Sequence, residues 1–173
     1  IQLKLDPIKV FSYIKKQNLP GRVVSNDGGY QSIDIQNKPI HLVDEILKQV
    51  NIFGKKCNIK NNLIMDNMWL NINKHKNSNR EHRHLRCIFS GTYYIKVPKN
   101  SGNIVFINPN VDIMEYAWHR SLFDDFNKFN SGHWYIPPSV GELILFPSFL
   151  KHYVEPNLSK EERVSISFNI TNE

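Results

Sequence analysis

Two histidines that stand one residue apart are the residues of this sequence best suited to metal chemistry. His82 and His84 occur in 80-REHRHLRCIFSGTYYIKVP-98, which leads into an apolar run typical of a strand. Side chains alternate between the two faces of a strand, so a His-x-His pair there would point both imidazoles to one face. The pair is therefore either part of a metal site or a coincidence of composition.

The other histidines differ in their surroundings. His41 lies on a predicted helix and His75 in a polar loop, where a structural or solvated role is more common. His119 and His133 flank a long connection, and their roles stay open at this point. His152 stands apart, because it follows an apolar strand and an aromatic turn.

An alternating strand begins eleven residues after His152. In 163-RVSISFN-169, Arg163, Ser165 and Ser167 fall on one face and the apolar residues between them on the other. An arginine and two serines are unusual on a surface strand but suit the inside of a barrel that binds a carboxylate. The planar guanidinium matches a carboxylate with two hydrogen bonds, and a serine hydroxyl adds a third donor.

The elements that must position these residues change in type along the chain. Two amphipathic helices are predicted first, over 7–17 and 39–52. Short strands bounded by glycine, proline, asparagine or charged residues follow, over 63–73, 87–97, 103–108, 133–138, 141–148 and 163–170. This order predicts an α+β, mostly β chain whose body is an antiparallel barrel or jelly roll. We expect one domain over 1–173, with a helical support region at 1–60 and a β core at 61–173.

Composition narrows the class of protein. The chain has 173 residues, enough for one sizeable core, and no apolar run approaches the roughly 18 residues that span a membrane. No signal peptide is recognisable, and two cysteines are too few for a disulfide framework, so we expect a cytoplasmic protein with reduced thiols. The net charge of +6 comes mainly from lysines scattered among asparagines, which does not by itself identify a nucleic-acid partner.

Taken together, these segments resemble the 2-oxoglutarate- and Fe(II)-dependent oxygenases, in particular the prolyl 4-hydroxylase-like members and a small branch found in bacteria and marine phages. The resemblance is carried, in the expected order, by 25-SNDGGYQS-32, 69-WLNIN-73, 82-HRHLRCIFSGTYYIKVP-98, 137-PPSVGELILFPSFLKHYVEP-156 and 163-RVSISFN-169. It implies a double-stranded β-helix with the N-terminal helices packed outside. It also implies Fe(II), 2-oxoglutarate and O2, with ascorbate as a further candidate, and the cytoplasm of a bacterium or a phage-infected host cell.

For the metal, the resemblance implies that His82 is the first ligand and His152 the distal histidine ligand. The family's usual motif is His-x-Asp or His-x-Glu, whereas His84 occupies the third position here and no aspartate occurs between Asp66 and Asp112. His84 either completes a three-histidine site, since imidazole suits Fe(II), or lies behind a site in which water is the third ligand. We favour His84 as a ligand. His-x-His is also how the small branch reads, so the departure does not indicate an inactive enzyme.

For the co-substrate, the resemblance implies that Arg163 pairs with the far carboxylate of 2-oxoglutarate, with Ser165 beside it. Tyr94 would add a hydrogen bond from its hydroxyl to the same carboxylate, and Asn71 is a weaker candidate for lining the pocket. An apolar wall is expected from Ile104, Phe106, Leu143, Leu145 and Phe146.

The implied activity is hydroxylation of an unactivated C–H with conversion of 2-oxoglutarate to succinate and CO2. A peptidyl proline or another protein side chain is the expected substrate. A nucleobase or nucleic acid, a free amino acid or small metabolite, and a non-catalytic cupin-like binding module are the alternatives, and no membrane partner is expected. The long connection over 109–132 is a candidate lid over the substrate.

Overall fold

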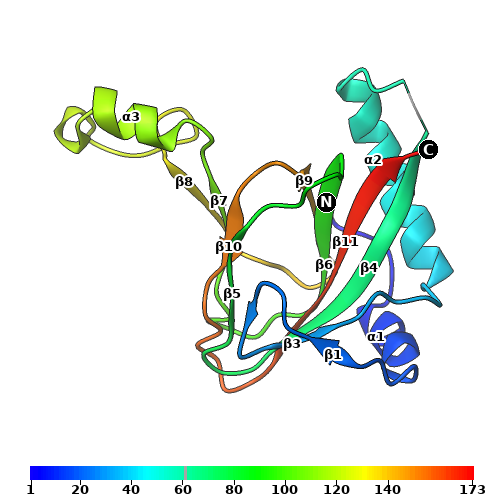
Figure 1. Ribbon diagram of the computed structural model, residues 1–173. Helices are drawn as coiled ribbons and strands as arrows, with labels where there is room; N and C mark the ends of the chain where they lie inside the picture. The colour runs from blue at the N-terminus through cyan, green and yellow to red at the C-terminus, as the bar shows by residue number, and fades with distance from the viewer. Residues whose placement is uncertain (61) are drawn as a thin grey trace.

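Two antiparallel sheets form the body of the protein in the computed structural model, which describes residues 1–60 and 62–173. The larger sheet has the order β1 (Gly21–Arg22), β3 (Tyr30–Ser32), β4 (Leu63–Asn73), β11 (Arg163–Asn172), β6 (Phe89–Lys96) and β9 (Leu143–Pro147). The smaller sheet has the order β2 (Asn26–Asp27), β5 (Ser78–His82), β10 (His152–Val154), β7 (Ile104–Ile107) and β8 (His133–Ile136). Figure 1 shows the smaller sheet on one side of the larger sheet and the two N-terminal helices on the other. The prediction of a mostly β chain with outer helices is confirmed.

The alternation on β11 determines which chemistry each face of the larger sheet carries. Val164, Ile166 and Phe168 are at most 2% exposed and belong to the main core, together with residues of both N-terminal helices. The residues between them point the other way, into the space between the sheets. The alternation predicted for 163–169 is therefore confirmed, and one strand separates an apolar layer from a polar cavity.

Both N-terminal helices cover the outer face of the larger sheet. Helix α1 (Pro7–Lys15) begins after Asp6, whose carboxylate accepts hydrogen bonds from the N–H groups of Ile8 and Lys9. Helix α2 (Ile40–Lys56) runs four residues further than the sequence predicts. It buries one face through Leu42, Ile46 and Val50, each 0% exposed. Burial of these faces stabilises the helices and fixes them on the sheet.

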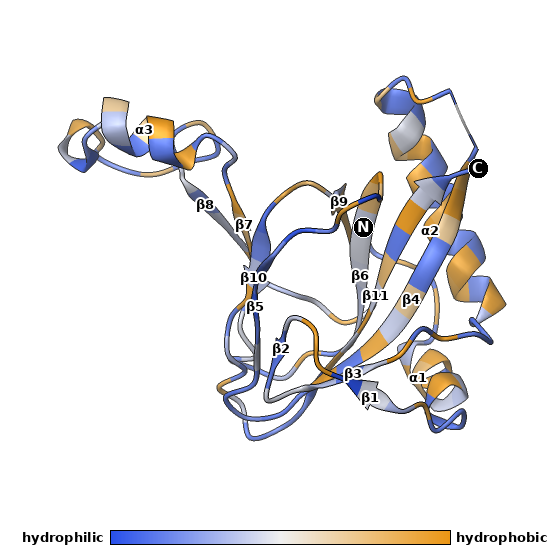
Figure 2. Ribbon diagram, in the orientation of Figure 1, coloured by the Kyte–Doolittle hydropathy of each residue, from blue (hydrophilic) through white to orange (hydrophobic). Residues whose placement is uncertain are grey.

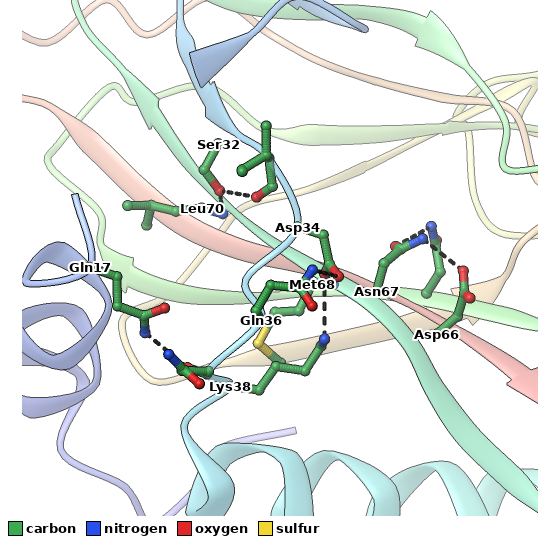
Figure 3. Close-up of polar contacts among 12 residues, drawn as sticks. Gln17, Ser32, Asp34, Gln36, Lys38, Asp66, Asn67, Met68 and Leu70 are labelled. Atoms are coloured by element: carbon green, nitrogen blue, oxygen red, sulfur yellow. Dashed lines mark hydrogen bonds and ion pairs between the residues drawn. The ribbon is translucent and has the colours of Figure 1, made fainter. Parts of the chain in front are cut away.

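The segment that joins β3 to α2 is held to the edge of β4 by side chains (Figure 3). Leu70 donates its N–H to the Ser32 hydroxyl at 2.9 Å, and Met68 donates its N–H to the Asp34 carboxylate at 2.8 Å. Lys38 forms an ion pair with the same carboxylate at 3.5 Å. The hydroxyl of Ser32 and the carboxylate of Asp34 take the place of a neighbouring strand along this part of β4. These backbone N–H groups of β4 are therefore paired, and the strand has no open edge here.

The 109–132 connection forms an arm between β7 and β8 that contains α3 (Val111–Ala117) and the short 3-10 helix η1 (Arg120–Leu122). Figure 1 shows this arm extending away from the two sheets. Several of its large apolar side chains are exposed, including Tyr116 at 94% and Phe129 at 76%. The lid role stays a prediction. Among residues 1–60 and 62–173, no helix is both long and apolar enough to cross a membrane.

Candidate active site

Three histidines converge on the inner side of the smaller sheet. His82 is the last residue of β5 and His152 the first residue of β10, and the two are directly paired across the antiparallel ladder. His84 follows two residues later, and the ligand nitrogens of the three side chains lie within 4.8 Å of one another. The ring centroids are 4.3 Å apart for His82 and His152, and 5.2 Å apart for His84 and His152. Histidines are the only metal-ligating side chains in this group, which could hold a metal ion.

The expectation that His82 and His84 share one face of a strand leading into 87–97 is wrong. Strand β5 ends at His82, and β6 begins only at Phe89 in the other sheet. The connection between them carries His84, whose backbone N–H donates to the carbonyl of Ser148 at 3.0 Å. The position of the His84 ring beside the other two histidine rings is therefore set by this loop, which is anchored to the end of β9, rather than by side-chain alternation along a strand.

Backbone carbonyls orient two of the three rings. The Nδ1 atom of His82 lies 2.7 Å from the carbonyl oxygen of Arg80, and the Nδ1 atom of His152 lies 2.9 Å from that of Leu150. A carbonyl oxygen can only accept, so each Nδ1 carries the hydrogen and each Nε2 keeps its lone pair. This is the arrangement that a metal-binding histidine requires, with the second nitrogen fixed by an outer hydrogen bond.

Burial keeps the three imidazoles neutral. It lowers the pKa of His152 to about 3 and that of His84 to about 4, and the neighbouring His82 adds to both shifts. Burial also lowers the pKa of His82, against the opposing effect of the Arg80 carbonyl. At neutral pH all three side chains are thus available as ligands without first losing a proton.

A cavity between the sheets extends from the three histidines to Arg163. Arg163 is the first residue of β11 and is 2% exposed. Its Nη1 group donates to the backbone carbonyl of Ser101 and to that of Glu155 at 3.3 Å. Its Nη2 atom is buried and has no hydrogen-bond partner within residues 1–60 and 62–173. Among the described residues no carboxylate forms an ion pair with this guanidinium. A buried cation with an unused donor is what an incoming carboxylate would complete.

Three neighbouring strands contribute the polar wall beside Arg163. Ser165 on β11 lies directly between Tyr94 on β6 and Asn71 on β4, and all three line the cavity. Burial raises the pKa of the Tyr94 hydroxyl far above its usual value of 10, so it remains a hydrogen-bond donor. Asn71 donates from Nδ2 to the Ser167 hydroxyl at 3.0 Å. The structure thus places every site residue named from the sequence around one cavity.

The apolar wall is only partly as expected. Ile104, Phe106 and Phe146 pack together between the sheets, and the Phe146 ring lies 4.8 Å from that of His152. Leu143 and Leu145 instead face the helical layer, because they alternate with Ile144 and Phe146 along β9.

Sequence reasoning missed several further residues of the cavity, among them Thr92 and Asn79. Thr92 lies two residues before Tyr94 on β6 and therefore on the same face, so the period-two pattern of side chains could have identified it. Asn79 lies on β5, a strand that the sequence analysis did not predict. His119 and His133, whose roles were open, belong to the arm and to β8 and are not in the histidine cluster.

The comparisons with known proteins define the class to which this fold and site belong. A family model described as "Putative 2OG-Fe(II) oxygenase" matches residues 67–169, which include all three histidines and Arg163. The chain belongs to this family of 2-oxoglutarate- and Fe(II)-dependent oxygenases. Comparison with curated protein sequences gives no match.

Solved structures share the fold at low sequence identity. A prolyl-4-hydroxylase from Pseudomonas putida is 13% identical with a TM-score of 0.66, over 99% of this chain and 89% of that one. The viral collagen prolyl hydroxylase of Paramecium Bursaria Chlorella virus-1, in complex with 2OG, is 14% identical with a TM-score of 0.62, over 95% and 88%. HygX from Streptomyces hygroscopicus, with nickel and 2-oxoglutarate bound, is 10% identical with a TM-score of 0.63, over 99% and 81%. The two facing sheets are thus a double-stranded β-helix, as predicted.

The residues present fit the family's metal and co-substrate. Three neutral imidazoles, with free Nε2 atoms on at least two of them, suit a divalent transition metal. The unused Nη2 donor of Arg163 at the far end of the same cavity suits a carboxylate. The donor set therefore matches Fe(II) at one end and 2-oxoglutarate at the other.

Proposed function

We propose that the protein is a 2-oxoglutarate-dependent dioxygenase in which His82, His84 and His152 hold Fe(II). One observation carries the proposal: a neutral three-histidine cluster and an unpaired buried arginine line the same cavity. His84 is the third ligand in this proposal, rather than a residue behind a bound water. Its support is that its nitrogen lies within 4.8 Å of the other two and that its ring is kept neutral by burial.

Arg163, Tyr94 and Ser165 bind the far carboxylate of the co-substrate. The guanidinium supplies the charge and the Nη2 donor, and the two hydroxyl groups add neutral donors from the neighbouring strand positions. Asn71 helps to hold the wall, through its bond to Ser167. The apolar group formed by Ile104, Phe106 and Phe146 excludes water from the metal side of the cavity. When bound, Fe(II) with 2-oxoglutarate and O2 supplies the oxidising chemistry that hydroxylates an unactivated C–H and yields succinate and CO2.

The proposed substrate is a protein side chain, most naturally a peptidyl proline. Support comes from two structural neighbours whose names identify them as a prolyl-4-hydroxylase and a collagen prolyl hydroxylase. The cytoplasm of a bacterium or of a phage-infected cell is the proposed compartment. This fits the free thiols of Cys57 and Cys87.

Succinate formation tests the proposal. The protein is incubated with Fe(II), O2 and 2-oxoglutarate, with and without a proline-rich peptide, and succinate is measured for the parent, His152→Ala and Arg163→Ala. We expect Fe(II)-dependent succinate from the parent and at least about a hundredfold less from either variant. A cupin-like binding module would bind metal or 2-oxoglutarate without producing succinate, and that result would reject the enzymatic proposal.

A further inference from the structure

A second hollow leads from the surface to two of the three histidines, His82 and His84. It shares His82 and His84 with the inner cavity, but it opens between β1, β5 and the loop after β5 and does not include Arg163. The inner cavity therefore suits the co-substrate, and the outer hollow, here called the arginine groove, leads from solvent to the same histidines. The arginine groove is defined by Arg22, Arg80, Arg83, Trp69, His82 and His84.

The arginine groove is positively charged. Arg22, Arg80 and Arg83 are exposed, and among the described residues none of them forms an ion pair. The groove contains one carboxylate, Glu81, which is paired with Lys151 at 3.1 Å. Three unpaired guanidinium groups at the entrance to a candidate metal centre match carboxylates on an incoming chain, because each can bind a carboxylate with two parallel hydrogen bonds.

The aromatic residue of the groove does not suit a nucleic acid. Single-stranded nucleic acid binds through bases stacked on accessible aromatic faces as well as through charge. Trp69 is only 7% exposed, with the Arg22 guanidinium 5.9 Å from its ring centroid and the His84 ring also 5.9 Å away. Because its ring is already covered, the groove offers charge and hydrogen-bond donors but no stacking platform.

We propose that the arginine groove binds an acidic segment of a protein substrate, so that aspartate or glutamate residues flank the residue that reacts. The proposal rests on the proposed function for the identity of the metal centre. Arg80 and Arg83 bracket His82 in the chain, and Arg22 approaches from β1 on the other sheet. Acidic side chains on either side of the reacting residue would meet these guanidinium groups, while the uncharged reacting residue reaches the histidines. The groove would thereby select substrates by charge as well as by the reacting side chain.

The test compares labelled nine-residue peptides that differ only in charge. One peptide has a central proline with two glutamates on each side, and its partner has glutamine in place of every glutamate. Binding is followed by fluorescence anisotropy under anaerobic conditions, with protein loaded with Fe(II) and 2-oxoglutarate. We expect the glutamate peptide to bind at least about tenfold more tightly, with a difference that shrinks as salt is added.

Variants locate the binding surface. Arg22→Gln, Arg80→Gln and Arg83→Gln should each weaken the glutamate peptide about threefold and leave the glutamine peptide unchanged. Lys56→Gln, at the end of α2 in the outer helical layer, removes a positive charge from an exposed position and should change neither. Equal binding of the two peptides, or equal loss in all four variants, would overturn the proposal. So would a single-stranded oligonucleotide that binds more tightly than the glutamate peptide and loses affinity in the same three groove variants.

Separate measurements distinguish this proposal from the proposed function. Calorimetry of 2-oxoglutarate binding to the Fe(II)-loaded protein, without peptide, reports on the inner cavity alone. Charge-selective peptide binding that depends on the three arginines, without 2-oxoglutarate binding, would retain the arginine groove and reject the oxygenase assignment. Binding and turnover of 2-oxoglutarate, with equal binding of the two peptides, would retain the oxygenase assignment and reject the arginine groove as a substrate-binding site.

Discussion

The two faces of the larger sheet differ in polarity and in role. The outer face is apolar, and it packs against α1 and α2 in a core that includes Phe168. The inner face of the same strands carries Arg163, Ser165 and Asn71, and the Nη2 group of the arginine finds no partner in the part of the chain that the structure describes. Figure 2 shows the related contrast between strands, with hydrophobic residues frequent along β4 and β11 and hydrophilic ones along β5 and β10. The helix-and-sheet layer thus supplies stability, which leaves the barrel interior free to hold polar groups that await a ligand.

Substitutions on opposite faces of β11 test this division most strongly. Phe168→Ala should lower the free energy of unfolding by about 3–5 kcal/mol, because it removes a ring that is 0% exposed from the outer core. Ser167→Ala, next in the chain and facing the cavity, should cost only about 1 kcal/mol through its bond with Asn71. Urea unfolding followed by tryptophan fluorescence measures both. Comparable losses from the two variants would show that the cavity face also stabilises the fold.

The acid sensitivity of the metal-free protein should come from the cavity side. In the unfolded chain the imidazoles bind protons near pH 6.5, whereas in the folded protein His84 does so only near pH 4 and His152 near pH 3. Between these values the unfolded state binds more protons, so stability is lost as the pH falls below 6.5. We expect the urea midpoint of chelator-treated protein to drop steadily from pH 7 to pH 4.5. The His84→Gln variant should show a shallower drop, and an unchanged slope would mean that His84 titrates normally.

Metal affinity distinguishes the two roles considered for His84. If all three histidines are ligands, His82→Ala and His84→Ala should each weaken Fe(II) binding by at least about a hundredfold, measured by competition with a chromophoric chelator. His41→Ala, at an exposed position on α2, is the matched control and should leave binding unchanged. If only His84→Ala binds Fe(II) as tightly as the parent does, His84 is not a ligand and water is the third ligand.

The sequence predicted best those elements in which side-chain alternation and burial agree. The bounds of β4 were predicted as observed, and the faces of β11 were assigned correctly, because apolar residues there alternate with polar ones. Strand β5 was missed since its sequence, 78-SNREH-82, has no apolar residue, and β10 since it has only three residues. Periodicity detects a strand through its buried face, and these short strands give almost no such signal.

The sequence named residues that the fold gathers around one cavity, but it did not show how the fold brings them together. His82 and His152 were chosen separately, yet a single ladder pairs them directly. His84 reaches them through a hydrogen bond to Ser148, which lies 64 positions further along the chain and could not be inferred from local spacing. Arg22 was overlooked for the same reason, because only the tertiary fold brings β1 beside the loop after β5.

A smaller effect than the loss of a metal ligand is expected at the backbone that holds Arg163. Gly102 has a φ of +80°, and a Cβ atom there would lie 2.7 Å from the carbonyl oxygen of Glu155. That oxygen accepts one of the hydrogen bonds from Nη1 of Arg163, at 3.3 Å. Gly102→Ala should therefore shift the guanidinium and weaken 2-oxoglutarate binding by roughly threefold to tenfold, with Fe(II) affinity unchanged.

A second glycine separates this local effect from general backbone strain. Gly28 has a φ of +72°, and a Cβ atom there would meet the side-chain amide of Asn77 rather than an acceptor of Arg163. Gly28→Ala should therefore lower stability through the same left-handed backbone strain without altering 2-oxoglutarate affinity, as measured by calorimetry and urea unfolding. If both variants bind 2-oxoglutarate equally well, the guanidinium is held by the cavity wall itself. If both variants weaken 2-oxoglutarate binding equally, co-substrate affinity depends on the overall stability of the fold. The stabilising face and the binding face of β11 would then be less independent than their contacts indicate.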